Sequence, residues 1–242
     1  MGNEVKPYTD REDKKGQVSK MFNKIAPYYD FLNRLLSLGI DTIWRKKAID
    51  QLKNEQPKFI LDVATGTADV AIETVKRLHP DKIIGIDIST EMLEIGRKKI
   101  SKRGLDTVIT LQEGDSENLP FADNTFDAIT VAFGVRNFEN LEKGLLEMRR
   151  VLKTNGKLVV LEFSKPSIFP IKQLFNLYFK YLLPLIGRLT SKDPRAYQYL
   201  YESVQAFPDG NDFVNILSKT GYKSNQCIPL TLGICSIYSG QK

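Results

Sequence analysis

Three acidic residues, Asp62, Asp87 and Asp115, stand at the ends of successive short apolar runs. A strand that is buried on both faces of a parallel sheet has such an apolar sequence, and ligands of these sheets bind outside the carboxyl ends of the strands. A carboxylate at this position accepts hydrogen bonds from ribose hydroxyl groups or from an adenine amino group. The three residues together therefore predict a binding site for a nucleoside.

The loop that follows Asp62 consists of small residues and contains Gly66 and Thr67. Small side chains let a ligand approach the backbone closely. The G-x-G-x-x-G pattern of dinucleotide sites is absent here, and no lysine follows as in a phosphate-binding P-loop. The loop therefore favours a ligand with an amino-acid carboxylate and a sulfonium over a pyrophosphate. A tight turn between a strand and a helix remains the alternative.

The residues beside the second and third strand ends make the expected ligand more specific. Ser89 or Thr90 suffices as a helix N-cap, which leaves Asp87 free to bind both hydroxyls of a ribose. Asp115 and Ser116 are expected to meet an adenine amino group with a carboxylate and a backbone amide. At position 115, an aspartate that only bonds its own loop backbone is the alternative.

Short apolar segments alternate with helical patterns along the chain, and these elements must position the acidic residues. We expect strands at 58–63, 82–87, 107–112, 126–133, 157–163, 223–228 and 234–238. We expect helices at 18–52, interrupted at Pro27 and Gly39, and at 70–78, 90–103, 141–152 and 209–220. In the turn 153–156, Asn155 tolerates a left-handed conformation. The pattern predicts an α/β fold, with a mostly parallel sheet covered by helices on both faces.

The segment 166–201 is long, rich in aromatic residues and without strand character. Within it, residues 171–186 carry apolar side chains at helical spacing, and Pro184 and Gly187 end this pattern. We expect this segment and the N-terminal helical region to cover the site. The helix at 171–186 is a candidate to admit a lipid tail or to rest at a membrane surface. A buried core helix or a homodimer interface is the alternative.

The composition is that of an ordinary globular protein of 242 residues. We expect one domain at 17–242 and a mobile polar tail at 1–16. The net charge of +6 is mild, so we expect no nucleic acid partner. The two cysteines make neither a disulfide framework nor a metal cluster. No secretory signal and no bilayer-spanning apolar run are visible, so the sequence predicts a cytoplasmic protein.

Two long motifs and three short ones are more specific than the small-residue loop. The long motifs are 29–44, which begins Tyr-Asp-Phe-Leu-Asn and ends at Trp44, and 150–164, which reads Arg-Val-Leu-Lys-Thr-Asn-Gly-Lys-Leu-Val-Val-Leu-Glu-Phe-Ser. The short motifs are 133–137, 197–203 and 207–208. Together they resemble the ubiquinone and menaquinone biosynthesis C-methyltransferases, and the resemblance extends from Val18 to the C-terminus.

This resemblance implies a seven-stranded, Rossmann-like class I methyltransferase fold, whose last two strands are the C-terminal runs. It also implies S-adenosylmethionine as the methyl donor and a prenylated quinol as the acceptor. The residues that match the family's cofactor contacts are Thr67, Asp87, Asp115 and Ser116. The chain departs from the family at Asp41, where a histidine is frequent, and at Ala132, where some relatives carry serine. These departures leave the choice between a naphthoquinol and a benzoquinol open.

Carbon methylation of a quinol requires a group that accepts the hydroxyl proton. The single histidine, His79, lies in a loop before the second expected strand, far from the strand ends, so we expect no catalytic role for it. We expect Arg136 to stabilise the quinolate oxygen while Asn137 positions a water that accepts the proton. The alternative is that Arg136 pairs with Glu139 or Glu162 and only braces the loop.

Several aromatic residues are candidates for binding the acceptor ring. We expect Tyr29, Phe133 and Tyr197 to contact it, although aromatic residues at these spacings also pack in protein cores. Competing functions are a methyltransferase for another lipid or small molecule, a nucleotide-dependent oxidoreductase, and a non-catalytic protein that retains the cofactor pocket.

Overall fold

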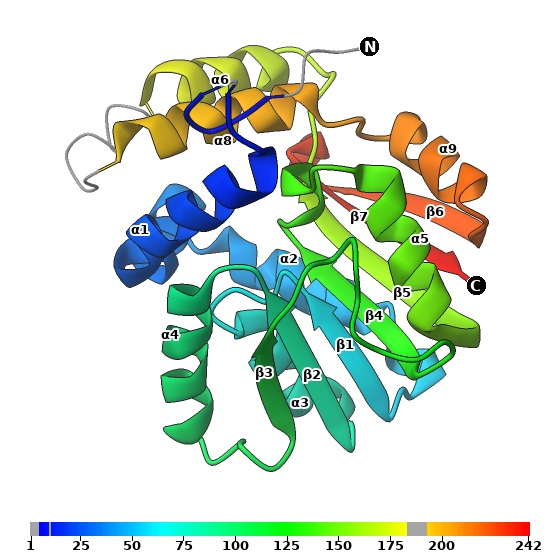
Figure 1. Cartoon of the computed structure of the whole chain (residues 1–242). Coiled ribbons are helices and arrows are strands. Elements are labelled where there is room, and N and C mark those ends of the chain that lie inside the picture. Colours follow the sequence, from blue (N-terminus) through cyan, green and yellow to red (C-terminus); the bar gives the residue numbers. More distant parts are fainter. Residues whose placement is uncertain (1–4, 10, 183–192) are drawn as a thin grey trace.

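Seven strands form one sheet in the order β3-β2-β1-β4-β5-β7-β6 (Figure 1). This computed structural model describes residues 5–9, 11–182 and 193–242. The strands are β1 (Phe59–Val63), β2 (Lys82–Asp87), β3 (Ile109–Glu113), β4 (Phe126–Ala132), β5 (Leu152–Phe163), β6 (Lys223–Leu230) and β7 (Cys235–Gln241). Strands β1 to β5 pair in parallel, and β7 runs antiparallel to both β5 and β6. The expected α/β fold with a mostly parallel sheet is confirmed.

Helices cover both faces of the sheet. They are α1 (Lys14–Leu36), α2 (Ile40–Asp50), α3 (Asp69–Leu78), α4 (Thr90–Ser101), α5 (Leu141–Val151), α6 (Ile171–Leu177), α8 (Pro194–Ala206) and α9 (Asn211–Lys219). A π-helical turn, η3 (Tyr178–Leu182), follows α6, and short 3-10 turns occur at η1 (Lys53–Glu55), η2 (Val135–Asn137) and η4 (Thr231–Gly233). Residues 183–186 of the helix expected at 171–186, and Gly187 after it, lie outside the described residues.

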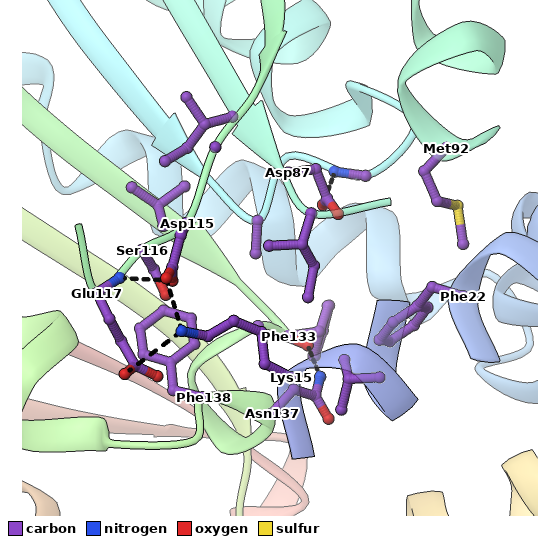
Figure 2. A pocket seen from close by; sticks show the side chains of 18 of the residues that line it. Lys15, Phe22, Asp87, Met92, Asp115, Ser116, Glu117, Phe133, Asn137 and Phe138 are labelled. Carbon is purple, nitrogen blue, oxygen red and sulfur yellow. Dashed lines mark hydrogen bonds and ion pairs between the residues drawn. The ribbon is translucent and has the colours of Figure 1, made fainter. Parts of the chain in front are cut away.

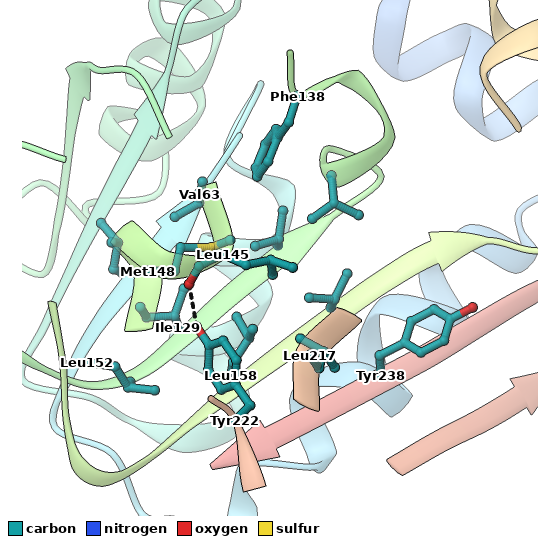
Figure 3. Packing of buried hydrophobic residues seen from close by; sticks show 14 of the residues in the cluster. Val63, Ile129, Phe138, Leu145, Met148, Leu152, Leu158, Leu217, Tyr222 and Tyr238 are labelled. Carbon is teal, nitrogen blue, oxygen red and sulfur yellow. Dashed lines mark hydrogen bonds between the residues drawn. The ribbon is translucent and has the colours of Figure 1, made fainter. Parts of the chain in front are cut away.

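The two faces of the sheet carry separate apolar clusters because successive strand side chains point to opposite sides. On one face, α5 and α9 pack on the sheet through residues such as Leu145, Met148 and Leu217 (Figure 3). There the buried Tyr222 hydroxyl donates a hydrogen bond to the Leu145 carbonyl, 3.1 Å away. On the opposite face, α2, α3 and α4 supply the cluster that includes Trp44. Burial on both faces explains why the strands appear in the sequence as apolar runs.

A third apolar cluster lies beyond the carboxyl end of the sheet, where α1, α6 and α8 gather (Figure 1). Its buried members are Val18, Met21, Leu32, Phe175, Ala196, Tyr197, Tyr199 and Val204. The expected cover from the N-terminal region and from 166–201 is therefore confirmed for the described residues. This cover faces the strand ends where the chemistry was expected.

Helix α1 is continuous through Pro27, so the expected interruption at this residue is wrong. A proline inside a helix removes one backbone hydrogen bond and costs about 3 kcal/mol. Burial of Met21, Ala26 and Leu32 on either side of it offsets this cost, since each large buried apolar side chain contributes roughly 1.5–3 kcal/mol. The expected break at Gly39 is confirmed, because Gly39 has a left-handed conformation and separates α1 from α2.

The segment before α1 contacts the cover. Arg195 Nε of α8 donates to the Pro7 carbonyl at 2.6 Å, and Gln17 Oε1 accepts the backbone amides of Tyr8 and Thr9. The expected mobility of 1–16 stays a prediction, and residues 1–4 and 10 of that range lie outside the described residues. Among the described residues, no helix is long and apolar enough to cross a membrane.

Asn155 has a φ of +63°, which confirms the expected left-handed conformation. The expected separate turn at 153–156 is wrong, because these residues form an irregular start of β5, where its pairing with β4 shifts register. A β-branched residue in this left-handed conformation is strained by about 1–2 kcal/mol. Asn155→Val should therefore lower the free energy of unfolding by about that amount, whereas Asn155→Gly should leave it unchanged or raise it slightly. Urea denaturation followed by circular dichroism measures both, and equal stability of the two variants would contradict the assignment.

Candidate functional site

Two adjoining cavities lie at the carboxyl edge of the sheet. The smaller of these two lies at the ends of the first four strands and has a volume of about 70 Å³ (Figure 2). The expected residues that line it are Gly66, Asp87, Asp115 and Ser116, together with Tyr29, Phe133 and Asn137. Parallel pairing explains this convergence, because Val63 of β1 is level with Ile86 of β2 and with Val131 of β4. The loops that follow these strands consequently open at one edge.

Asp87 lies at the end of β2 with its carboxylate held by the backbone. Its Oδ2 accepts the Gly66 amide at 2.8 Å, and its Oδ1 accepts the Ser89 amide at 2.9 Å. Desolvation raises the pKa of this carboxyl, and the amide bonds oppose the shift. The Ser89 hydroxyl accepts the Met92 amide as the N-cap of α4, so the expected cap is confirmed. Each carboxylate oxygen has a further lone pair for a ligand hydroxyl.

Asp115 contacts a lysine that the sequence reasoning missed. Lys15 Nζ lies 2.6 Å from Asp115 Oδ2 and 3.7 Å from Glu117 Oε2 (Figure 2). Asp115 Oδ1 also accepts the Glu117 amide, the local loop bond that was the open alternative. Lys15 comes from the first turn of α1, within the range expected to be a tail. Asp13, which is the N-cap of α1 and accepts the Gly16 amide, was the available signal for this helix start.

Asp62 and Thr67, two of the expected cofactor residues, do not line the smaller cavity. Asp62 is buried and accepts the hydroxyls of Thr65 and Thr130, each at 2.6 Å. Burial raises the pKa of Asp62 to about 6, against the effect of these two hydrogen bonds. Asp62 therefore stabilises the loop from within the sheet. The sequence placed Asp62 at the end of an apolar strand, but it did not show whether the side chain points into the sheet or towards the site.

The Thr67 hydroxyl belongs to a polar contact between α1 and the core. It donates to Asp30 Oδ1 at 2.6 Å, and Lys99 Nζ contacts the Thr67 hydroxyl at 3.0 Å and Asp30 Oδ2 at 2.9 Å. Lys99 also bonds Asp69 at the start of α3. Since Asp30 follows Tyr29 on α1, these contacts determine where Tyr29 lies.

The backbone of the loop has room for a ligand. Gly66 has a φ of +55°, and a Cβ built there would meet no atom within 4 Å. The smaller cavity therefore combines open space at Gly66 with carboxylates at the ends of β2 and β3. These residues fit the nucleoside of S-adenosylmethionine, which the resemblance implies.

The larger cavity has a volume of about 400 Å³ and lies between the strand ends and the cover. Its lining is mostly apolar, with residues from α1, α2, α6, α8 and the ends of β4 and β5. Tyr197 of α8 lines this cavity. Four residues line both cavities, so the two spaces meet at these side chains. They are Phe22, Tyr29, Phe133 and Asn137.

Arg136 is held by its neighbours at this junction. Its Nη1 lies 2.7 Å from Glu162 Oε1, and it donates to the Phe133 carbonyl at 2.6 Å. The Glu162 side chain is 0% exposed; burial raises the pKa of its carboxyl, and Arg136 opposes that shift. The bracing pair that was the alternative is therefore present. Phe133, whose carbonyl accepts this hydrogen bond, has a φ of +59°. Such a left-handed conformation is uncommon for a bulky residue and often occurs at functional sites.

Two polar atoms at the junction lack a partner among the described residues. They are Arg136 Nε, a donor, and Asn137 Oδ1, an acceptor, and both are buried. Buried polar groups in proteins are nearly always hydrogen-bonded, so such atoms point to a ligand or an ordered water. The Asn137 amide nitrogen already donates weakly to the Phe133 carbonyl, at 3.4 Å.

Solved structures with the same fold include many methyltransferases. One is a SAM-dependent methyltransferase from Thermotoga maritima, described as a possible histamine N-methyltransferase. It superposes with a TM-score of 0.65 at 18% identity, and the match covers 93% of this chain and 99% of that one. The [4+2]-cyclase SpnF has a TM-score of 0.62 at 16% identity, with 94% and 96% covered. The fold is therefore shown, while the chemistry has to come from the site and from closer relatives.

Sequence relatives are much closer. The model of the ubiE/COQ5 methyltransferase family matches residues 9–242. A demethylmenaquinone methyltransferase of Bacteroides fragilis is 51% identical over 238 residues, 98% of this chain and 97% of that protein. A ubiquinone/menaquinone biosynthesis C-methyltransferase of Geotalea daltonii is 46% identical over 231 residues, 95% and 98% of the two chains. The chain belongs to the ubiE/COQ5 methyltransferase family.

The Thr67 contact yields a test. Thr67→Val removes the hydroxyl between Asp30 and Lys99 and should lower the free energy of unfolding by about 1–3 kcal/mol, the cost of a lost hydrogen bond to a charged group. Thr67→Ser keeps the hydroxyl and serves as the control. Urea denaturation gives the stabilities, and calorimetry with S-adenosylhomocysteine gives the cofactor Kd. A weaker Kd in Thr67→Val without any loss of stability would show that the hydroxyl serves the cofactor directly.

Proposed function

We propose that this protein is an S-adenosylmethionine-dependent C-methyltransferase that methylates the ring of a prenylated quinol, converting demethylmenaquinol to menaquinol. The names of its relatives support this reaction, and some of them also name ubiquinone biosynthesis. A benzoquinol acceptor is therefore the alternative within the same chemistry. We further propose that residues 17–242 act as one methyltransferase domain.

The observation that carries this proposal is the junction of the two cavities. One is small and has carboxylates at the strand ends, and the other is large and apolar. Such a pair suits a nucleoside donor on one side and a prenylated acceptor on the other. Because Phe133 and Asn137 line both spaces, donor and acceptor would meet beside them. Holding two reactants in contact supplies a large part of the rate enhancement in group transfer.

In the smaller cavity, we propose that Asp87 binds the ribose hydroxyls and that Asp115 and Ser116 meet the adenine. Gly66 lets the ligand approach the loop backbone. The Asp62 carboxylate and the Thr67 hydroxyl already form hydrogen bonds to other protein side chains. These two residues therefore contribute by shaping the loop. When bound, S-adenosylmethionine supplies an electrophilic methyl group on a positively charged sulfur.

At the junction, we propose that Arg136 and Asn137 act on the acceptor hydroxyl. The Arg136 guanidinium presents its unpartnered Nε–H to the quinolate oxygen, which stabilises the negative charge as it develops. Asn137 Oδ1 holds a water that accepts the hydroxyl proton. The Glu162 pair limits the movement of Arg136, so the guanidinium is oriented before the acceptor binds.

The larger cavity fits the acceptor. We propose that Tyr29 and Phe133 contact the ring near the junction and that Tyr197 contacts the acceptor from the cover. The prenyl tail occupies the apolar space between α1, α6 and α8. Burial of apolar surface contributes about 25 cal/mol for each Å², so this space stabilises a prenyl chain without specific polar contacts.

Paired variants test these roles. Asp87→Asn should weaken binding of S-adenosylhomocysteine roughly 10- to 100-fold, because it removes charge-assisted hydrogen bonds. Asn137→Ala should leave that Kd little changed and lower kcat by roughly 10²–10³-fold, the effect of removing a polar group that stabilises the transition state. Calorimetry and transfer of labelled methyl groups to a demethylated, short-prenyl naphthoquinol measure the two quantities.

Leu146→Ser, at an exposed position of α5, serves as a control that should change neither value. Full activity of Asn137→Ala would contradict the proposed site. No methylation of any quinol by the wild-type protein, with clear transfer to another acceptor, would contradict the proposed function. Preference for a benzoquinol would assign the alternative acceptor.

We also propose a cytoplasmic protein that contacts the membrane peripherally at the mouth of the larger cavity. Leu38 and Leu174 line this cavity and are 85% and 58% exposed. Leu177 and Tyr181, which follow Leu174 in the chain, are also exposed, and Lys172 of α6 adds a positive charge. Arg34 precedes Leu38 in the chain but pairs with Asp41 at 3.4 Å. Apolar residues with basic neighbours suit an anionic membrane surface. A homodimer formed through the same exposed face is the competing arrangement.

Vesicle binding tests this contact. Replacing Leu38 and Leu174 together by serine should reduce the fraction of protein that sediments with phosphatidylglycerol vesicles, since two exposed apolar anchors are lost. Leu146→Ser again provides the matched control. If the wild-type protein is a dimer that the double replacement converts to a monomer, with no vesicle binding by either form, the face is a dimer interface and the membrane contact is wrong.

A further inference from the structure

Three aromatic side chains from three different elements meet in the wall of the larger cavity. They are Trp44 of α2, Phe133 after β4 and Phe163 at the end of β5, and we refer to them as the aromatic wall. The ring centroids of Phe133 and Phe163 lie 4.9 Å apart with an interplanar angle of 38°. The Trp44 ring lies 6.3 Å from Phe133 and 6.2 Å from Phe163, edge-on to the latter.

The aromatic wall is held in place independently of any ligand. Trp44 Nε1 donates to Thr231 Oγ1 at 2.7 Å, so the only polar atom of the indole ring is satisfied. Phe133 is fixed at its amide, which donates to the Leu161 carbonyl at 2.7 Å, and at its carbonyl, which accepts from Arg136. A rigid aromatic surface binds a flat ring with little loss of side-chain entropy.

The position of the aromatic wall links it to the reacting groups. Phe133 extends to the smaller cavity, and the Arg136 guanidinium carbon lies 5.5 Å from the Phe163 ring centroid. A ring that contacts Phe133 and Phe163 therefore lies beside both the junction and the guanidinium. Aromatic rings attract one another in offset or edge-on arrangements at centroid distances of about 4.5–7 Å.

We propose that Trp44, Phe133 and Phe163 together bind the aromatic ring of the acceptor, with Trp44 and Phe163 as binding residues that determine affinity for the ring. This inference rests on the proposed function, because it assumes a planar quinol as acceptor. The apolar space beyond the aromatic wall is then left for the tail. Trp44 does not line the smaller cavity, so its contribution is to the acceptor and not to the methyl donor.

The chain contains a single tryptophan, so its fluorescence reports on Trp44 alone. A quinone in contact with an excited indole quenches it by accepting an electron. Titration of the wild-type protein with a demethylated, short-prenyl naphthoquinone should therefore give saturable quenching. S-adenosylhomocysteine alone should change the emission little. Quenching that does not saturate, and that equals the quenching of free N-acetyltryptophanamide, would overturn the proposal.

A variant pair makes the test specific. Phe163→Leu keeps the fluorophore and should raise the half-saturating quinone concentration roughly tenfold, the effect of losing one aromatic contact. Phe121→Leu removes an aromatic ring that packs on Phe126 outside both cavities and should leave the half-saturation unchanged. Equal half-saturation in Phe163→Leu and the wild type would overturn the proposal. Thermal unfolding confirms that both variants are folded.

Methyl transfer distinguishes failure of this inference from failure of the proposed function. If Phe163→Leu does not fold, Trp44→Phe should raise the KM for the quinol several-fold with an unchanged Kd for S-adenosylhomocysteine. Ring methylation by the wild type without saturable quenching overturns the aromatic wall and leaves the function standing. Saturable quenching without methylation of any quinol overturns the function and supports a ring-binding site at Trp44.

Discussion

The architecture depends on one constraint, which is that the central parallel strands are apolar on both faces. Polar groups cannot lie between the sheet and its helices without hydrogen-bond partners, so the chemistry is confined to the carboxyl edge. The strand order β3-β2-β1-β4-β5 reverses direction between β1 and β4, and the loops on either side of this point separate there. Gly66 and Phe133 follow β1 and β4, the two strands at this reversal, and Asp87 ends β2, which lies on the other side of β1.

The cover converts that open edge into two adjoining cavities. Helices α1, α6 and α8 share an apolar cluster of their own, so they are held together by burial and not by the sheet. Polar contacts then attach α1 to the core, through Lys14 to the Phe138 carbonyl and through Asp30 to Thr67. This arrangement places Tyr29 and Phe22 of α1 opposite Phe133, where the nucleoside side and the apolar side meet.

The buried pair of Arg136 and Glu162 allows one residue to brace the loop and to take the catalytic role proposed for it. A buried charge needs a partner, because removing one member of such a pair costs about 3–5 kcal/mol. Glu162 therefore orients the Arg136 guanidinium, while Nε of the same group has no partner among the described residues. Under the proposed mechanism, the two hypotheses for Arg136 that the sequence left open involve different atoms of one side chain.

The sequence by itself determined the fold class, the family and the strand ends that carry Asp87, Asp115 and Ser116, because local patterns of apolar and polar residues encode them. Only the tertiary structure decided which side chains enter a cavity. The Thr67 hydroxyl bonds Asp30, the Asp62 side chain lies in the sheet, and Lys15 pairs with Asp115. These outcomes depend on contacts between residues far apart in the chain, which no local pattern contains. The meeting of Trp44, Phe133 and Phe163 is decided in the same way, by the packing of α2 against the ends of β4 and β5.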